Sequence, residues 1–134
     1  MKRRSSRSIR GEHVLKDRGA VAVEFALVAP ILLALVAGIV EFSHAYNLQI
    51  SVTQAAREAA REMAIENNQG AAELAASAGA PGLTGADFDY VFSPASCTAG
   101  ENMTVTITYP AATLTGVFGS TVTVTGTGAM RCEG

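Results

Sequence analysis

The chain is short of charged side chains. Asp, Glu, Lys and Arg make up only 16% of its 134 residues, whereas soluble proteins average roughly 25%. Disorder requires low hydrophobicity and high net charge, so the 49% apolar content argues against a disordered chain. The formal net charge of −2 argues against a dedicated nucleic-acid-binding protein. A length of 134 residues predicts one small domain.

Histidine is scarce as well, and neither copy is placed for catalysis. His13 lies in a basic N-terminal arm, and His44 lies at the end of an apolar run. We find no nucleophile–base–acid set and no glycine loop suited to phosphate. Asp87 and Asp89 stand two residues apart near an expected strand, where solvation is the simpler interpretation. The sequence therefore predicts a protein that is not an enzyme and that holds no cofactor or metal.

The charges that are present are distributed unevenly. Residues 1–18 hold seven basic and two acidic side chains, a net charge of +5. Residues 19–134 hold three basic and ten acidic side chains, a net charge of −7. A basic arm is therefore followed by an acidic body, and the chain becomes apolar where the two meet.

An apolar run of 21 residues, Ala20–Val40, follows the basic arm and contains one charged residue, Glu24. As a helix it would span about 31 Å, close to the roughly 30 Å of a bilayer core. A buried core helix is disfavoured, because a chain this small has too little protein to surround it. The positive-inside rule predicts a cytoplasmic N-terminus and a translocated body.

Glu24 and Pro30 are unusual residues for such a run. An ionisable group in a membrane segment costs free energy, so it points to a function unless Glu24 is a tolerated interfacial carboxylate. Pro30 removes one backbone hydrogen bond and is expected to kink or locally open the helix. Membrane helices tolerate proline, so Pro30 alone indicates little.

A secretory signal peptide is an alternative interpretation. Such signals have an apolar region of roughly 7–15 residues, shorter than this run, and a small-x-small cleavage site. Ser43-His44-Ala45 offers such a site before Tyr46. Cleavage there would release a periplasmic binding domain, and no cleavage at all would leave a simple membrane anchor.

The residues around the start of the run resemble a type IV prepilin leader junction. Arg18-Gly19 is followed by Ala-Val-Ala-Val and then by Glu24-Phe25. The longer string RGAVAVEFALVAPILLALVAGIVEFSHAYNLQISVTQAARE resembles the TadE-like family, pseudopilins of the tight-adherence (Tad or Flp) pilus system. The resemblance covers about a third of the chain. It implies a minor pilin in the bacterial inner membrane, acting in pilus assembly for surface adherence.

The resemblance also implies roles for particular residues. A prepilin peptidase would cut between Gly19 and Ala20, leaving Glu24 and Phe25 as the fifth and sixth mature residues. Glycine suits a scissile position because it lacks a β-carbon and lets a protease approach closely. Glu24 would pair with the new amine of a neighbouring subunit and fix the axial register of the helices. The implied partners are this peptidase, other pilins and pseudopilins, and the inner-membrane assembly platform, with no nucleic acid.

The helix is expected to continue past the membrane, because Glu41–Asn67 contains neither proline nor glycine. Small or apolar residues recur there at helical spacing, which predicts a packing face against the protein's own sheet or a neighbouring subunit. They are Ala45, Leu48, Val52, Ala55, Ala56, Ala59 and Met63. The whole helix would hold about 48 residues and span about 70 Å.

The remainder predicts a short helix over 71–78, a loop, and a small sheet. Residues 88–92, 103–109 and 121–125 alternate between apolar and polar side chains, as strands do. Three or so antiparallel strands with one face on the long helix give an α+β fold, which resembles the pilin plan of a helical spine and a β-sheet head. We expect a basic leader over 1–19, a transmembrane helix over 20–40, its extension over 41–68, a short helix and loop over 69–87, and an exported head over 88–134.

Both cysteines, Cys97 and Cys132, lie in the expected exported head. An even count in an oxidising compartment favours a disulfide, with two buried free thiols as the alternative. A bridge would close a loop of 35 residues, which contributes roughly 3–4 kcal/mol by the chain-entropy estimate. A zinc site is disfavoured, because the exported part adds only His44 as a soft ligand.

Overall fold

The computed structural model describes residues 11–116 and 119–133, with side chains described from residue 19 onward. Residues 1–10 of the expected leader lie outside this range. The chain divides into an N-terminal unit, Met1–Ile39, and a C-terminal unit, Val40–Gly134, and each is described by itself. Helix α1, Gly11–Glu66, contributes residues to both units.

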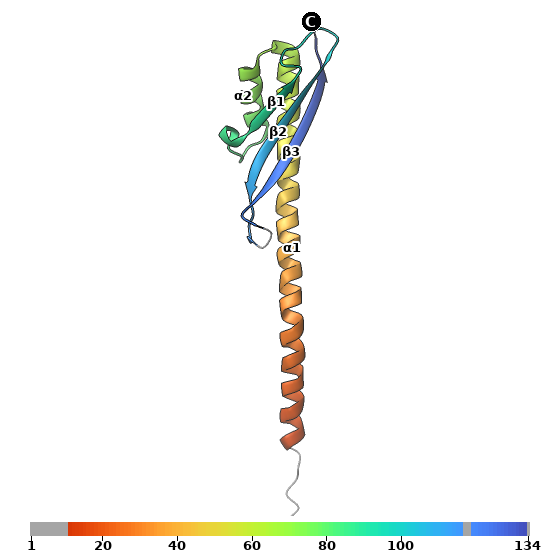
Figure 1. Cartoon of the computed structure of the whole chain (residues 1–134). Helices are drawn as coiled ribbons and strands as arrows, with labels where there is room; N and C mark the ends of the chain where they lie inside the picture. Colours follow the sequence, from red (N-terminus) through yellow and green to blue (C-terminus); the bar gives the residue numbers. More distant parts are fainter. Residues whose placement is uncertain (1–10, 117–118, 134) are drawn as a thin grey trace, which may run out of the picture. The chain divides into compact units, whose positions relative to one another are not determined.

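The C-terminal unit combines the last part of α1 with a second helix and a three-stranded sheet. After α1 come α2 (Gln69–Gly79), η1 (Gly85–Asp87), β1 (Asp89–Ser93), β2 (Asn102–Ala112) and β3 (Thr121–Arg131). The strands are antiparallel in the order β1-β2-β3, and Figure 1 shows them along the yellow and green part of α1. The expected α+β class and antiparallel meander are confirmed.

Helix α1 ends at Glu66, and the residue that follows it is an asparagine rather than a glycine. Asn67 has a positive φ of 49°, a left-handed conformation that asparagine tolerates better than most residues. The Asn67 N–H donates to the carbonyl of Met63 and closes the last turn. Asn68 then caps α2, because its side chain accepts a hydrogen bond from the N–H of Ala71. The second helix therefore begins at Gln69, two residues before its expected start.

The central strand β2 alternates as its sequence predicts. Met103, Val105 and Ile107 are fully buried, and the threonines between them are partly exposed. The strand extends beyond the expected 103–109 and includes Pro110. Proline is tolerated there because β1 pairs only as far as Thr108, so Pro110 has no strand on that side to which it would donate.

Strand β3 is longer than the expected 121–125, because it continues through two glycines, Gly126 and Gly128, to Arg131. A Cβ on Gly126 would lie within 3.0 Å of the Val52 backbone, and one on Gly128 within 3.0 Å of the Ala56 backbone. The glycines thus mark a close approach of strand and helix backbones rather than the end of the strand. Two strand residues advance about 6.8 Å and four helix residues about 6.0 Å, so β3 and α1 stay in register.

The face of α1 that packs on the sheet is built mostly from alanine. Small side chains allow the helix to lie close to the two strand glycines, and α2 packs nearby through Gly79 against Ala55 and Glu58. The predicted packing face is therefore directed at the protein's own sheet. Its fully buried members are Val52, Ala55, Ala56, Ala59 and Met63, and Ala60, which was not predicted for this face, is fully buried as well.

A disulfide joins Cys97 and Cys132, whose Cα atoms are 5.6 Å apart. The Cys132 N–H also donates to the carbonyl of Glu101, at 2.8 Å. On the other side, the Asn67 side chain accepts from the Cys97 N–H at 2.6 Å and donates to the Cys97 carbonyl at 3.3 Å. The end of α1 is thus attached to the segment that carries the disulfide.

Candidate functional site

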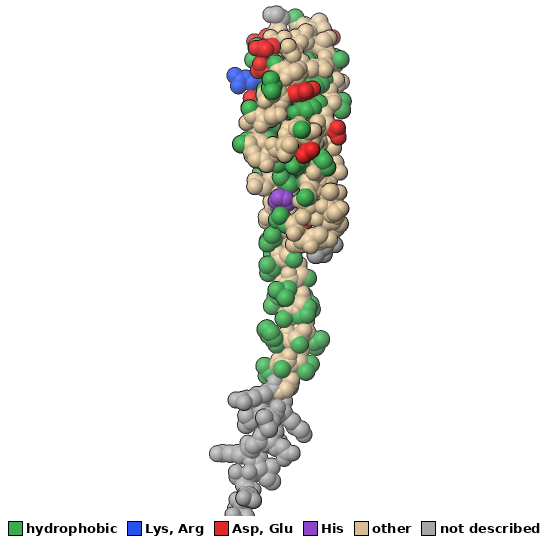
Figure 2. All heavy atoms as spheres, turned by 90° about the vertical axis from the view of Figure 1, so that its left-hand side faces the viewer, with side chains coloured by type: hydrophobic (Ala, Val, Ile, Leu, Met, Phe, Trp, Pro, Cys, Tyr) green, Lys and Arg blue, Asp and Glu red, His purple; other side chains and the backbone are tan. Residues whose placement is uncertain are grey.

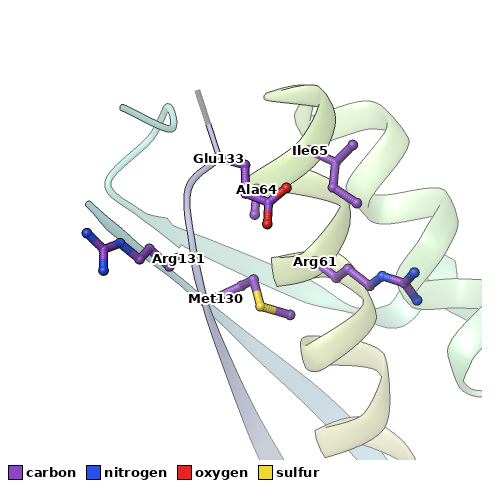
Figure 3. A pocket seen from close by; sticks show the side chains of 6 residues that line it. All are labelled: Arg61, Ala64, Ile65, Met130, Arg131 and Glu133. Carbon is purple, nitrogen blue, oxygen red and sulfur yellow. The ribbon is translucent and has the colours of Figure 1, made fainter. Parts of the chain in front are cut away.

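Shallow hollows occur on the described surface, and two of them are considered for a site. One, of about 270 Å³, lies between the end of α1 and the end of β3, and Figure 3 shows the guanidinium groups of Arg61 and Arg131 pointing away from one another. The other, of about 310 Å³, is lined by α1 alone, from Tyr46 to Arg57. Within the described residues, no group of three His, Cys, Asp or Glu side chains is placed to hold a metal ion.

The residues that the sequence singles out lie instead on the apolar part of α1. The described helix from Gly19 onward holds an 18-residue window with a mean hydropathy of 2.5, and none of that window is buried. Leu27 is 67% exposed and Leu33 is 70% exposed. Exposed apolar surface of this extent marks a contact with lipid or with other protein. By length and composition this helix is suited to cross a membrane.

The candidate processing and register residues all lie on this exposed helix. A Cβ on Gly19 would meet no atom within 4 Å, so the backbone there is open on that side. Ala20 and Glu24 are exposed, and Phe25 is 70% exposed. Helix α1 continues through Pro30 without a break. Cleavage, a helix kink and a register contact at these residues stay predictions.

Glu41 is a site residue for which the sequence predicted no role. It follows the apolar run directly, yet it is only 8% exposed. Its carboxylate accepts hydrogen bonds from the backbone N–H groups of Leu114 and Thr115, each at 2.9 Å, and from Thr115 Oγ1 at 2.9 Å. These donors lie in the loop after β2, more than seventy residues along the chain. The sequence shows a carboxylate at the end of an apolar run, but it does not show that Leu114 and Thr115 would bind this carboxylate.

The hydrogen bonds to Glu41 also set its ionisation. Burial by itself raises the pKa of this carboxyl group. The donors of Thr115 and Leu114, with a smaller effect of His44, outweigh burial and hold the pKa of Glu41 below its ordinary value of 4.5. Glu41 is therefore charged at neutral pH while it binds the loop.

The sequence around these residues was compared with known proteins. The family model described as TadE-like protein matches residues 19–61. Residues 19–61 are TadE-like. The resemblance seen at the leader junction and along the apolar helix is thereby confirmed. No curated protein and no solved structure matches the chain.

The TadE-like segment includes the residues on which the site depends. It begins at Gly19, contains Glu24 and Glu41, and continues through the alanine face that packs on the sheet. The sheet lies outside the matched residues. This match supports a protein associated with the Tad pilus, in a family of structural pilus components, and the apolar helix fits a membrane-anchored component.

Proposed function

We propose that this chain is a minor pilin, or pseudopilin, that takes part in the assembly of a Tad-type (Flp) type IV pilus for surface adherence. The observation that carries the proposal is the TadE-like match over 19–61, which begins at the glycine of the leader junction. The exposed apolar helix supports it, because that helix needs lipid or other helices around it. The C-terminal unit has its own core, so it is suited to be carried by this helix.

The processing step follows from the order of the segments. The basic arm keeps the N-terminus in the cytoplasm, which places Gly19 at the cytoplasmic end of the apolar run. A prepilin peptidase acting there would cut between Gly19 and Ala20. The cut removes the basic arm and leaves the apolar helix on the mature subunit. The mature protein then has a single membrane pass, with its C-terminal unit in the periplasm or outside the cell.

The assembly step uses the two groups that the cut brings close together. The new amine at Ala20 lies four residues, or about 6 Å along a helix, from Glu24. In an apolar setting a carboxylate and an ammonium group attract strongly, and each costs free energy if left unpaired. Pairing between neighbouring subunits would set their axial register. The proposed partners are therefore other pilins and pseudopilins, together with the peptidase and the inner-membrane assembly platform.

Cleavage before Tyr46, as by a secretory signal peptidase, fits the structure less well. That cut would remove Glu41, whose carboxylate holds Leu114 and Thr115. The C-terminal unit would then lose a buried residue and the attachment of its loop. This observation favours retention of the helix through residue 41, either in a processed pilin or in an uncleaved anchor.

The mature N-terminus tests the proposal. The protein is isolated from its membranes and its N-terminal residue is determined by mass spectrometry. We expect Ala20 for the wild-type chain and Met1 for Gly19→Leu, which places a bulky side chain at the scissile position. The matched control Gly38→Leu adds the same side chain where a Cβ meets nothing within 4 Å, and it should still yield Ala20. Met1 or Tyr46 at the start of the wild-type protein would contradict the proposal.

A further inference from the structure

The hairpin of β2 and β3 carries no charged side chain before its last residue, Arg131. Between Glu101 and Arg131 the sequence contains no Asp, Glu, Lys or Arg. Figure 2 shows the acidic side chains gathered over one half of the C-terminal unit on the face in view, while the half that holds the histidine shows mostly apolar and uncharged polar groups. The C-terminal unit thus has a charged half and a half with little charge.

The hairpin tip, here Leu114 and Thr115, lies beside Glu41, where the apolar run ends. Gly128 lies against Ala56, Gly126 lies against Val52, and the Gln49 side chain donates to the carbonyl of Thr125 at 2.6 Å. The strand therefore follows α1 back toward the first turn of this unit. Glu41 then binds the tip itself, one residue after the apolar run ends at Val40.

Exposed apolar side chains lie at the same level. Leu114, whose N–H binds Glu41, is 58% exposed. Phe42 is 72% exposed and Tyr46 is 61% exposed, and their rings stack with centroids 6.3 Å apart. Phe42 and Glu41 are successive helix residues, so they point in directions about 100° apart. The exposed groups therefore lie on more than one side of the helix.

This arrangement favours a flat lipid surface over a single protein partner. A partner helix covers one side of α1, whereas a bilayer surface meets every side of a helix that enters it. Tyrosine and other aromatic side chains prefer the boundary between headgroups and acyl chains. An uncharged hairpin also contacts this boundary without burying a charge, and it needs no particular headgroup charge.

We propose that the tip of the β2–β3 hairpin at Leu114, held by Glu41, docks with Phe42 and Tyr46 on the headgroup–acyl boundary of the bilayer. This inference rests on the membrane anchorage in the proposed function. It gives the C-terminal unit a fixed height on the membrane and leaves its charged half directed away from the lipid. The side chains proposed to contact the lipid, Leu114, Phe42 and Tyr46, are uncharged, so docking does not require a charged headgroup.

Single tryptophan residues can test the position of the tip, since the chain contains no tryptophan. The full-length protein is placed in phosphatidylcholine vesicles that contain brominated acyl chains, which quench tryptophan within the bilayer. Leu114→Trp reports on the tip. Leu33→Trp, at a 70% exposed position of the apolar run, reports on anchorage. Leu74→Trp, at a 75% exposed position of α2, is the matched control outside the proposed contact.

We expect lipid bromine to quench the tryptophans at positions 33 and 114, and acrylamide in the water to quench the one at 74. Loss of quenching at 33 would contradict membrane anchorage and thus the proposed function. Quenching at 33 combined with an aqueous response at 114 would overturn only the docking proposal. A tryptophan at 114 shielded from both quenchers would place protein on the tip and would also overturn it.

A second variant tests the part played by Glu41. In the Leu114→Trp background, Glu41→Ala removes the acceptor for the Leu114 and Thr115 donors. We expect loss of lipid quenching at position 114 and retention of the aqueous response at 74 in the matching Leu74→Trp protein. Quenching at 114 that stays unchanged would overturn the role given to Glu41.

Discussion

Gly128 in β3 lies against the backbone of Ala56 in α1, too close for a side chain on the strand residue. Its missing Cβ would lie within 3.0 Å of the Ala56 backbone, which a helix cannot move without disturbing its own hydrogen bonds. Gly128 has no positive φ, so glycine is needed here for space and not for an unusual backbone conformation. The same holds for Gly126 against Val52, so two glycines determine how closely the sheet lies on the helix.

We expect Gly128→Ala to destabilise the C-terminal unit by about 1–3 kcal/mol, the usual cost of overpacking a dense core. The matched control is Ala129→Val, which enlarges the next residue of the same strand on its exposed side. Denaturant unfolding of the full chain in detergent micelles, followed by tyrosine fluorescence, measures both. Equal stability of the two variants would show that strand and helix separate easily at Gly128.

Asn67 is expected to contribute to stability in two separable ways. Asn67→Ala places alanine, which tolerates the left-handed region less well than asparagine, at φ 49°. It also removes both hydrogen bonds to Cys97, for a total cost of about 2 kcal/mol. Asn67→Gly tolerates the backbone conformation and removes only the hydrogen bonds, so it should cost about 1 kcal/mol less than alanine. The same unfolding measurement ranks the variants. Glycine as harmful as alanine would mean that φ contributes nothing.

The attachment of the hairpin tip to Glu41 is expected to weaken in acid. The pKa of Glu41 is lowered in the folded protein, so its contribution is complete above the ordinary value of 4.5 and is lost as the pH falls through the lower folded value. The amide proton shifts of Leu114 and Thr115, followed by NMR against pH, should titrate with a midpoint below 4.5. Glu41→Gln should abolish this titration. A midpoint above 4.5 would contradict the hydrogen-bonded carboxylate.

Much of the fold was predictable because its signals are local. The alternation of Met103–Ile107 and the alanine spacing near Val52 record the face that each element buries, and the apolar run records a segment long enough to cross a membrane. The end of α1 was predictable in place, since asparagines and a glycine follow Glu66. The lengths of β2 and β3 were not, because Pro110 and Gly126 weaken strand patterns. Their acceptability depends on which strand or helix lies opposite, and that is tertiary information.

The candidate site divides in the same way. Gly19 and Glu24 stand out in the sequence because each departs from its surroundings, a glycine after a basic arm and a carboxylate in an apolar run. Glu41 did not stand out, because acidic residues are common at the ends of such runs. Its role comes from Leu114 and Thr115, which approach it only after the hairpin has packed on α1.

The last prediction concerns Glu24 and separates a pilin from an ordinary membrane anchor. If Glu24 is merely tolerated, Glu24→Val should be harmless and should even ease insertion. If Glu24 pairs with the freed amine of a neighbour, its removal leaves an unpaired cation in an apolar setting and costs several kcal/mol in association. Insertion and cleavage depend on the basic arm, Gly19 and the apolar run, so both should survive. We therefore expect Glu24→Val to be inserted and processed, to fail in co-purification with other pilins from detergent, and to abolish pilus formation.

Glu66→Val is the matched control, since it removes an exposed carboxylate from the other end of α1 and should assemble normally. Normal assembly of Glu24→Val would mean that Glu24 does not set the register of the subunits.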